Sequence, residues 1–123
     1  MSDQPMVIDD VRDVAKLQAM LPFRPLTDAG RRGAEIFPLF APGAGDPDGA
    51  AAAIVRYLPG ATAPRHLHPG HEMILVLEGT LETEHGVFPQ GSLQVLPPGS
   101  DHAPTSAEGC TMIIVWERPV KVL

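Results

Sequence analysis

The sequence predicts an all-β sandwich or barrel, and three observations support this prediction. From residue 35 onward, short apolar runs alternate with segments such as PGAGDPDG and PPGS, whose composition favours chain reversal. Short strands at this spacing are typical of antiparallel sheets. The 123 residues are enough for one hydrophobic core, and neither an internal repeat nor a linker divides them.

The amino-terminal arm, residues 1–34, has two candidate structures. The segment VRDVAKLQAML could form a short helix that Asp9 or Asp10 would cap and that Pro22 and Pro25 would end soon afterwards. Its apolar residues at helical spacing are Val11, Val14, Leu17 and Leu21. An extended arm that packs on the barrel or on a neighbouring subunit is the alternative.

Residues 35–123 contain the predicted strands. The apolar runs are EIFPLF, AAAIVRYL, HEMILVLEGTLETE, SLQVL and TMIIVWERPVKV. The segment LETEHGVF indicates a tight hairpin, in which Gly86 can take the positive φ that such turns need. In the long central run, apolar residues lie on both faces of the strand, so one set would line the barrel and the other would pack under the arm or a second subunit. The two sets are Met73, Leu75 and Leu77, and Ile74, Val76 and Glu78.

The composition narrows the choice of partners and location. A net charge of −6 disfavours nucleic acid, whose binding requires neutralisation of phosphates. No stretch of ~20 apolar residues is present, so we expect no membrane span, and the acidic start MSDQPMVIDDVRD is unlike a signal peptide. Cys110 is the only cysteine, which suits a reducing cytoplasm, and we expect it to be a small buried hydrophobic residue.

Three histidines and one glutamate could form a transition-metal site. His66 and His68 are two residues apart, so a strand would project both from the same face. Glu72 follows a Pro-Gly break that can bring its carboxylate beside them, and His102 follows a Pro-Pro-Gly turn that could begin a facing strand. Imidazole and carboxylate suit one divalent ion per chain, Zn or Fe first, with Mn, Ni, Co and Cu as alternatives. An octahedral ion with these four ligands would keep two open positions.

Each of these residues also has an ordinary structural interpretation. Two histidines on a strand are often half-exposed polar residues, Glu72 could be a surface charge, and His102 could be a turn residue bonded to backbone. His71 should face away from Glu72, either at the surface or behind the ligands. His85 should be a solvated residue at the hairpin tip.

The glycines and prolines around these residues resemble the two cupin motifs. The first motif, G(X)5HXH(X)3-4E(X)6G, is matched at Gly60, His66, His68, Glu72 and Gly79. The second, G(X)5PXG(X)2H(X)3N, is matched at Gly91, Pro97, Gly99 and His102, with Ser106 in place of the asparagine. The segments PRHLHPGHEMILVLEG, EHG, PPGSDHAP and EGC resemble the ChrR-like cupin family, which is RmlC-like, over residues ~35–118. The segment LPFRPL resembles that family's lead-in strand.

The resemblance implies a cupin jelly-roll β-barrel, or double-stranded β-helix, of six or more strands with the metal inside. Residues 1–34 would then be an arm and residues 35–123 the cupin domain. By the same resemblance, the metal ligands are His66, His68, Glu72 and His102, and the chain forms a homodimer through an apolar sheet face. The loss of the motif's asparagine at Ser106 affects a position that supports the backbone rather than the metal.

Two functions of different kinds fit the resemblance. The first is a metal-dependent enzyme, of the dioxygenase or isomerase type, that acts on a small carbonyl or phenolic compound. Its catalytic side chains are not identified by the sequence, and the candidate pocket residues are Arg56, Tyr57, Gln94 and Trp116, with Arg56 and Arg65 equally able to be solvated. The alternative is a non-enzymatic module that senses a metal or ligand, as in the cupin domain of ChrR-type anti-sigma factors. The chain lacks the CxxC pair with which those factors grip the sigma factor, which disfavours sigma-factor inhibition.

Overall fold

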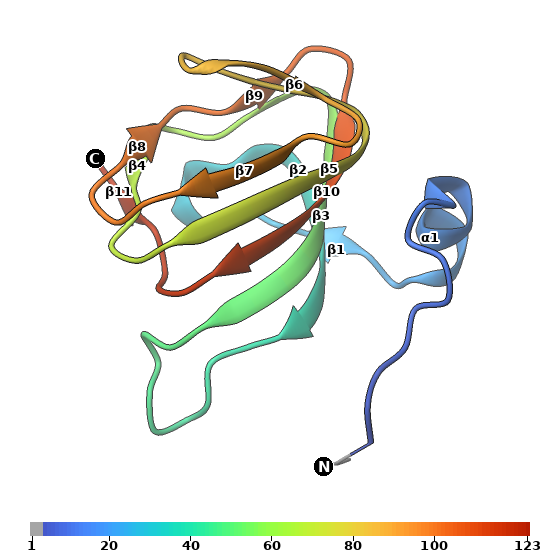
Figure 1. The fold of residues 1–123 in the computed structure, drawn as a ribbon, viewed down its shortest axis with the longest axis horizontal. Coiled ribbons are helices and arrows are strands. Elements are labelled where there is room, and N and C mark those ends of the chain that lie inside the picture. Colours follow the sequence, from blue (N-terminus) through green and yellow to red (C-terminus); the bar gives the residue numbers. More distant parts are fainter. Residues whose placement is uncertain (1–3) are drawn as a thin grey trace.

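The computed structural model describes residues 4–123 as an open-ended β-barrel with a short helix on its outside (Figure 1). The larger sheet has the order β1-β2-β3-β10-β5-β6, with β7 paired to β5 and β9 paired to β3 and β5. Its strands are β1 (Arg24–Pro25), β2 (Arg32–Phe40), β3 (Ala51–Thr62), β5 (Glu72–Thr83), β6 (Gly86–Pro89), β7 (Leu93–Leu96), β9 (Thr105–Ser106) and β10 (Cys110–Trp116). The smaller sheet has the order β11-β4-β8 and comprises β4 (His66–Leu67), β8 (Asp101–His102) and β11 (Lys121–Val122). The all-β prediction is therefore confirmed.

The barrel interior is closed by side chains from alternate positions of the long strands. Ile74 and Val76 on β5 point inward, and Met112 and Ile114 on β10 pack with them. β10 is antiparallel to both β3 and β5, so apolar side chains from three neighbouring strands meet on the same face. The interior of the predicted barrel is thus a packed core with a polar site at one end.

The outer face of the same sheet is covered in part by α1 (Val14–Met20). Val14 and Leu17 of this helix pack on Ile54 of β3 and Leu77 of β5. The segment VRDVAKLQAML thus contains the helix that the first alternative expects. The predicted cap is wrong, however, because the Asp13 carboxylate accepts the hydrogen bond from the Lys16 amide at 3.1 Å, and Asp9 and Asp10 lie outside the helix.

The arm and the barrel are not separated at residue 34. β2 begins at Arg32, and β1 pairs with it, Arg24 facing Ile36 and Pro25 facing Glu35. Phe23 and Phe37 also pack with ring centroids 6.4 Å apart. Residues 24–34 thus add a strand and a turn to the sheet that the sequence assigns to residues 35–123. Within residues 4–123, no helix is long and apolar enough to cross a membrane.

Gly79 shows why a motif position requires glycine. It lies in β5 with φ +78, next to a register shift between β5 and β10. A Cβ atom there would collide with the Gly109 carbonyl oxygen and would lie 2.8 Å from the Cα of Cys110. Any larger residue would push β10 away from β5.

The hairpin and the two small residues near it have the expected structures. Thr83 faces Gly86 across the β5–β6 turn, and Gly86 has φ +145. Ser106, which stands in the place of the motif's asparagine, is fully buried and donates a hydrogen bond to the Thr80 carbonyl at 2.6 Å. It therefore supports the backbone as that position would require. Cys110 is buried, as expected.

Candidate metal centre

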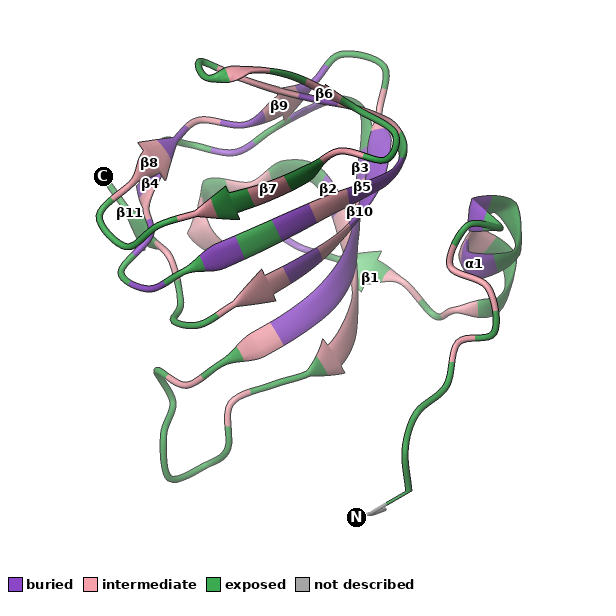
Figure 2. Cartoon of the chain, in the orientation of Figure 1, coloured by how far each residue is buried: buried purple, intermediate pink, exposed green. Residues whose placement is uncertain are grey.

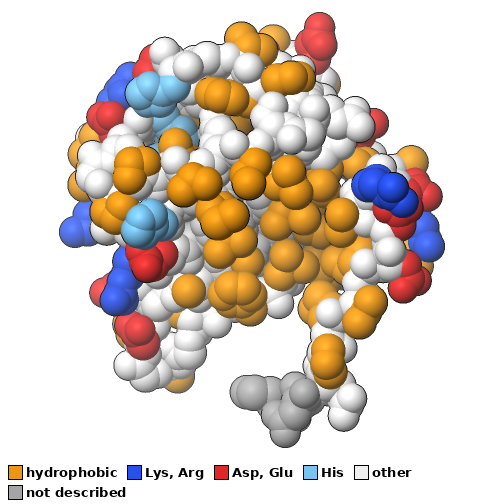
Figure 3. All heavy atoms as spheres, viewed as in Figure 1, with side chains coloured by type: hydrophobic (Ala, Val, Ile, Leu, Met, Phe, Trp, Pro, Cys, Tyr) orange, Lys and Arg blue, Asp and Glu red, His pale blue; other side chains and the backbone are white. Residues whose placement is uncertain are grey.

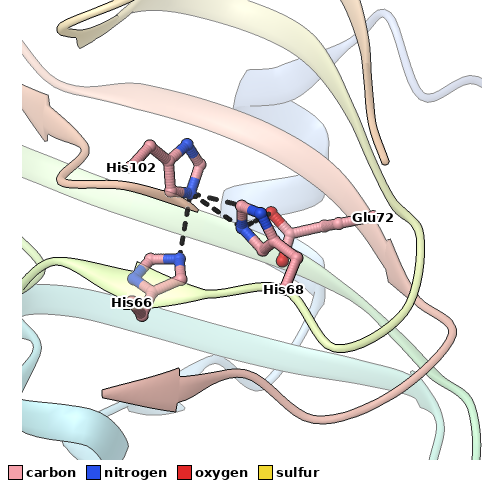
Figure 4. A group of neighbouring side chains, drawn as sticks. All are labelled: His66, His68, Glu72 and His102. Carbon is pink, nitrogen blue, oxygen red and sulfur yellow. Dashed lines mark hydrogen bonds and ion pairs between the residues drawn. The ribbon is translucent and has the colours of Figure 1, made fainter. Parts of the chain in front are cut away.

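The four predicted ligands come together at one end of the barrel interior (Figure 4). His66 on β4 faces His102 on β8 across an antiparallel pair, so their side chains leave the small sheet side by side. His68 follows β4, and Glu72 is the first residue of β5. Each side chain is at least 96% buried. One ligand atom from each residue lies within 4.8 Å of the others.

The second turn segment holds His68 in place. The His68 amide donates to the Ser100 carbonyl at 2.9 Å, and the Gly99 amide donates to the His68 carbonyl at 2.8 Å. The Ser100 hydroxyl donates to the Pro97 carbonyl at 2.6 Å, so it accepts at 2.9 Å from Nδ1–H of His68. The Pro-Pro-Gly turn of the sequence thus orients an imidazole that is 32 residues away.

The tautomers of two histidines follow from these partners. A carbonyl oxygen can only accept, so His66 Nδ1 carries a proton and donates to the Pro64 carbonyl at 2.9 Å. His68 Nδ1 carries a proton for the reason given above. In the neutral rings, Nε2 of His66 and Nε2 of His68 are therefore unprotonated, and each presents a lone pair to the site.

The third histidine creates a crowded set of acceptors. His102 Nε2 lies 2.9 Å from His66 Nε2 and 3.2 Å from His68 Nε2. A single proton on His102 Nε2 could serve one of these contacts and would leave two lone pairs facing each other in the second. His102 Nδ1 and Glu72 Oε1 are buried without a hydrogen-bond partner. A shared cation removes the conflict, because all three Nε2 atoms can then be ligands and the His102 proton moves to Nδ1.

The spacing of the donors fits a first-row metal. Ligands at right angles on bonds of ~2.1 Å are about 3.0 Å apart, close to the two contacts between imidazoles. Glu72 Oε2 lies 3.5 Å from His68 Nε2 and 3.9 Å from His102 Nε2, so the carboxylate completes the group from the β5 side. The His3Glu set could therefore hold one metal ion.

Burial favours the uncharged form of all four residues, which suits metal binding for the histidines and opposes it for Glu72. Loss of solvation lowers the pKa of His66, and lowers the pKa of His68 to about 4 and of His102 to about 3, with neighbouring imidazoles adding to the shift of the last two. The rings are thus neutral at physiological pH. Burial raises the pKa of Glu72 to about 7, against the influence of Arg31 and of a hydrogen bond from Trp116. A bound cation would favour the ionised carboxylate.

A small cavity of about 20 Å³ inside the barrel is lined by three of the four residues. His66, Glu72 and His102 line one side, and Tyr57 and Trp116 also line it. Most of the remaining wall is apolar. Those side chains are Leu26, Val55, Ile74, Leu81, Met112 and Ile114.

A family model identifies the fold. The model described as "ChrR Cupin-like domain" matches residues 12–121 of this chain. The chain belongs to this cupin family. The similarity that the two sequence motifs indicate is therefore confirmed, and solved structures of RmlC-like cupins are also similar to the chain. A search of curated proteins finds no match.

Three similar solved structures illustrate the range of proteins with this fold. The acetylacetone dioxygenase from Acinetobacter johnsonii has a TM-score of 0.76 at 14% identity, over 100% of this chain and 79% of that chain. The polyketide cyclase RemF from Streptomyces resistomycificus has a TM-score of 0.68 at 20% identity, over 85% and 81%. The complex of Rhodobacter sphaeroides SigE with the anti-sigma ChrR gives a TM-score of 0.59 at 22% identity, over 92% and 69%. At these identities the likeness concerns the fold alone.

The remaining predicted pocket residues are divided between the interior and the surface of the cupin. Tyr57 and Trp116 line the cavity, and Trp116 faces Glu72 across β10 and β5. Arg56 instead pairs with Glu35 at 3.4 Å outside the cavity. Gln94 is not among the described residues that line the cavity, although its Oε1 is buried without a partner.

The other histidines and Arg65 lie at the surface. His71 pairs with Glu117 at 3.0 Å, and His85 Nε2 lies 3.0 Å from the Asp101 carbonyl. Arg65 forms ion pairs with Glu84 at 3.4 Å and with Asp101 at 3.5 Å.

The cavity contains one charged side chain that sequence reasoning missed. Arg31 lines it, although Arg31 lies in the segment assigned to the arm. A signal was available in the sequence, because the run Gly30-Arg31-Arg32-Gly33 places two arginines between glycines directly before a predicted strand. That pattern could not say which arginine faces inward.

Proposed function

We propose that this cupin is a metal-dependent enzyme of the dioxygenase or isomerase type that acts on a small carbonyl or phenolic compound. The observation that carries the proposal is the convergence of three imidazole Nε2 atoms and a buried carboxylate beside a small cavity. A purely structural metal site would have little reason to adjoin a cavity whose other walls are apolar.

The four residues His66, His68, Glu72 and His102 would hold one divalent ion, Zn or Fe first. Such an ion supplies Lewis-acid chemistry and, in the case of Fe, redox chemistry towards dioxygen. The chain's own groups orient and shield the reactants. The apolar wall excludes water, which strengthens every polar interaction with a bound substrate.

Tyr57 is the side chain best placed to hold a proton for a substrate oxygen. It is 5% exposed, and burial raises the pKa of its phenol to about 12. The hydroxyl therefore stays protonated at neutral pH and can donate a hydrogen bond into the cavity. Apart from the proposed ligands, the described lining residues include no carboxylate, serine or cysteine, which favours chemistry performed mainly by the metal.

Metal analysis and oxygen uptake test this proposal. Protein purified without chelators should contain about one first-row ion per chain, measured by plasma mass spectrometry. After loading with Fe(II), it should consume dioxygen in the presence of at least one member of a panel of diketones and hydroxy-aromatic compounds. His85→Ala, which changes an exposed histidine, is the matched control and should keep both properties. Protein that takes up no metal would contradict the site, and metal-loaded protein that is inactive on the whole panel would contradict the dioxygenase assignment.

A second candidate is a module that senses a metal or ligand without turnover. It is supported by membership of the family described by the ChrR cupin-like domain. In that case the chain should co-purify with a partner protein whose binding changes when the metal is removed. Affinity purification of the tagged chain, with and without chelator, distinguishes the candidates, because the enzyme proposal needs no partner.

We also propose that the chain forms a homodimer through the outer face of the large sheet. Beyond the area that α1 covers, Met73, Leu93 and Val95 are exposed, and Met73 and Val95 face each other across β5 and β7 (Figure 2). Figure 3 shows apolar side chains gathered over this part of the sheet. In sedimentation equilibrium, Val95→Glu should convert dimer to monomer, whereas Val87→Glu, at an exposed position on β6, should not. A monomeric wild-type protein would contradict the proposal.

A cytoplasmic location and the lack of nucleic-acid or membrane partners complete the proposal. The net charge of −6 supports the absence of nucleic-acid binding. Burial of the Cys110 thiol, which raises its pKa to about 11, makes it poorly reactive and suits a reducing compartment. Cell fractionation and a nucleic-acid gel shift would test both statements.

A further inference from the structure

A groove on the surface lies next to the interior cavity, and three side chains line both. A surface groove of about 390 Å³ is lined mainly by apolar residues from the η1 turn (Asp28–Gly30), β2 and the carboxyl-terminal segment. Leu26, Arg31 and Trp116 line both the groove and the cavity beside the proposed ligands. A molecule that entered from the groove would therefore meet these three side chains first.

Arg31 is directed towards the interior. It lines the interior cavity together with Tyr57, His66 and Glu72. Its Nη1 donates one hydrogen bond, at 3.0 Å, to the Asp28 carbonyl. Within residues 4–123, no carboxylate forms an ion pair with it, whereas Arg12, Arg56, Arg65 and Arg118 each have at least one. The Tyr57 side chain is also a hydrogen-bond partner of Arg31. A guanidinium has five N–H donors, so donors remain for a ligand in the cavity or groove.

The turn that presents Arg31 is held against the proposed metal site. Ala29 has φ +59 and Gly30 has φ +72, so two successive residues take the left-handed conformation. Gly30 lies so close to the segment between β3 and β4 that a Cβ atom on it would lie 2.9 Å from Pro64 Cγ. The Pro64 carbonyl is the group that orients His66. Arg31 is therefore positioned by the same segment that positions a ligand.

The charges on these groups do not balance without an anion. A divalent ion with the ionised Glu72 leaves a charge of about +1 among neutral imidazoles, and Arg31 raises it to about +2 beside an apolar wall. A single negatively charged oxygen group placed between the ion and Arg31 would halve this excess. Among the described residues that line the groove, Asp28 is the one acidic residue; it is exposed, and it disfavours a second negative charge on the ligand.

We propose that Arg31 binds the anionic oxygen of the substrate, and that the substrate is a small monoanion (a carboxylate, enolate or phenolate) with an apolar body that lies in the groove. The inference rests on the proposed function and names the class of compound that the metal site takes. A guanidinium suits such a group because it can donate two parallel hydrogen bonds to it. Leu26, Trp116 and the apolar part of the groove would contact the body of the molecule.

A pair of probes that differ mainly in charge tests the inference. Protein loaded with one Zn(II) per chain is titrated calorimetrically with benzoate and with its neutral analogue benzamide. Wild-type protein should bind benzoate at least about tenfold more tightly. Arg31→Gln should weaken benzoate binding by about 10- to 100-fold, the range for one charge-assisted hydrogen bond. The same substitution should change the affinity for benzamide by less than about threefold.

Two further variants separate a binding role from a structural one. Arg32→Gln removes the same charge from the next residue, which is exposed and lines neither space, and should leave both affinities unchanged. Arg31→Lys should restore benzoate binding to within about fivefold of wild type, because it keeps the charge. The inference would be overturned if Arg31→Gln weakened the binding of benzoate and benzamide equally. It would also be overturned if the wild type bound benzoate no more tightly than benzamide. Zinc content is measured on every sample, since a wild type without zinc would contradict the metal site itself, and normal zinc content with no charge preference contradicts only the role of Arg31.

Discussion

The same strands form both faces of the large sheet, but different groups pack against the two faces. The inner face is closed on itself, and the proposed ligands lie at one end of its packed core. The outer face combines apolar side chains with the Arg56–Glu35 ion pair, and α1 packs on the part around Ile54 and Leu77. On β5, Ile74 is 2% exposed and its neighbour Met73 is 41% exposed. The comparison teaches that the inner face depends on particular residues at the proposed metal site, whereas the outer face accepts partly exposed apolar and charged residues.

The largest expected difference between the regions concerns the histidines. His102→Ala removes the imidazole that touches both others, so metal content should fall from about one ion per chain to nearly none. His71→Ala changes an exposed imidazole that pairs with Glu117 and should keep the ion. Plasma mass spectrometry of the two purified variants measures the contrast. Equal metal content in both would remove the distinction between buried and exposed histidines.

Two methionines compare the packing of the faces directly. Met112 lies in the inner core at 1% exposure, so Met112→Ala should lower the free energy of unfolding by about 2–5 kcal/mol through lost contacts and a new cavity. Met73→Ala should cost less than about 1 kcal/mol in the monomer, because its side chain is partly in water. Urea denaturation at low protein concentration measures both. Similar losses would mean that the outer face is as tightly packed as the inner one.

Protonation should also distinguish the inner region. Since the folded-state pKa of Glu72 is raised to about 7 from 4.5, the metal-free site carries a proton at pH 6 that an ion must displace. Because the pKa values of His68 and His102 are about 4 and about 3, both rings are already neutral at pH 6 and release no proton when the ion binds. Metal binding should therefore release close to one proton from Glu72 at pH 6 and about one tenth at pH 8, and affinity should fall up to about tenfold per pH unit below 7.

Calorimetry in buffers of different ionisation enthalpy counts these protons. Glu72→Gln, which has no proton to lose, should bind the ion more weakly and release none at either pH. Equal release by the wild type at pH 6 and pH 8 would contradict the raised pKa of Glu72.

The smallest effect is expected at the edge of the outer region. Asp13→Ala removes the cap of α1 and should lower the free energy of unfolding by about 1 kcal/mol. Asp9→Ala, at the position that the sequence also suggested as a cap, should change it by less than about 0.5 kcal/mol. Urea denaturation compares the two, and the reverse order would contradict the assigned helix boundary.

Much of the inner region could be predicted because its signals are local. The spacing of His66 and His68 places them on one face of an extended segment, and the turn glycines and prolines mark where the chain reverses. Gly79 is required by a close approach of two strands, and the cupin motif records that requirement. The strand positions followed from the same alternation of apolar runs and turns.

The features that the sequence did not predict depend on contacts between distant segments. Arg56 was a pocket candidate, but its strand turns it outward to Glu35 on β2. Arg31 was assigned to the arm, yet the η1 turn places it at the cavity. Neither direction is encoded in the spacing of neighbouring residues, since each depends on the register between β2 and β3 and on how the arm joins the sheet.

The sequence by itself determined the class of fold, the turns and the four candidate ligands, because each depends on residues close together in the chain or on spacings that a strand converts into a shared face. The tertiary structure alone decided that His66 and His102 face each other, that α1 covers one part of the outer sheet, and that Arg31 and Trp116 stand between the cavity and the groove. The physical reason is that burial, charge and direction at these positions arise from contacts between segments tens of residues apart.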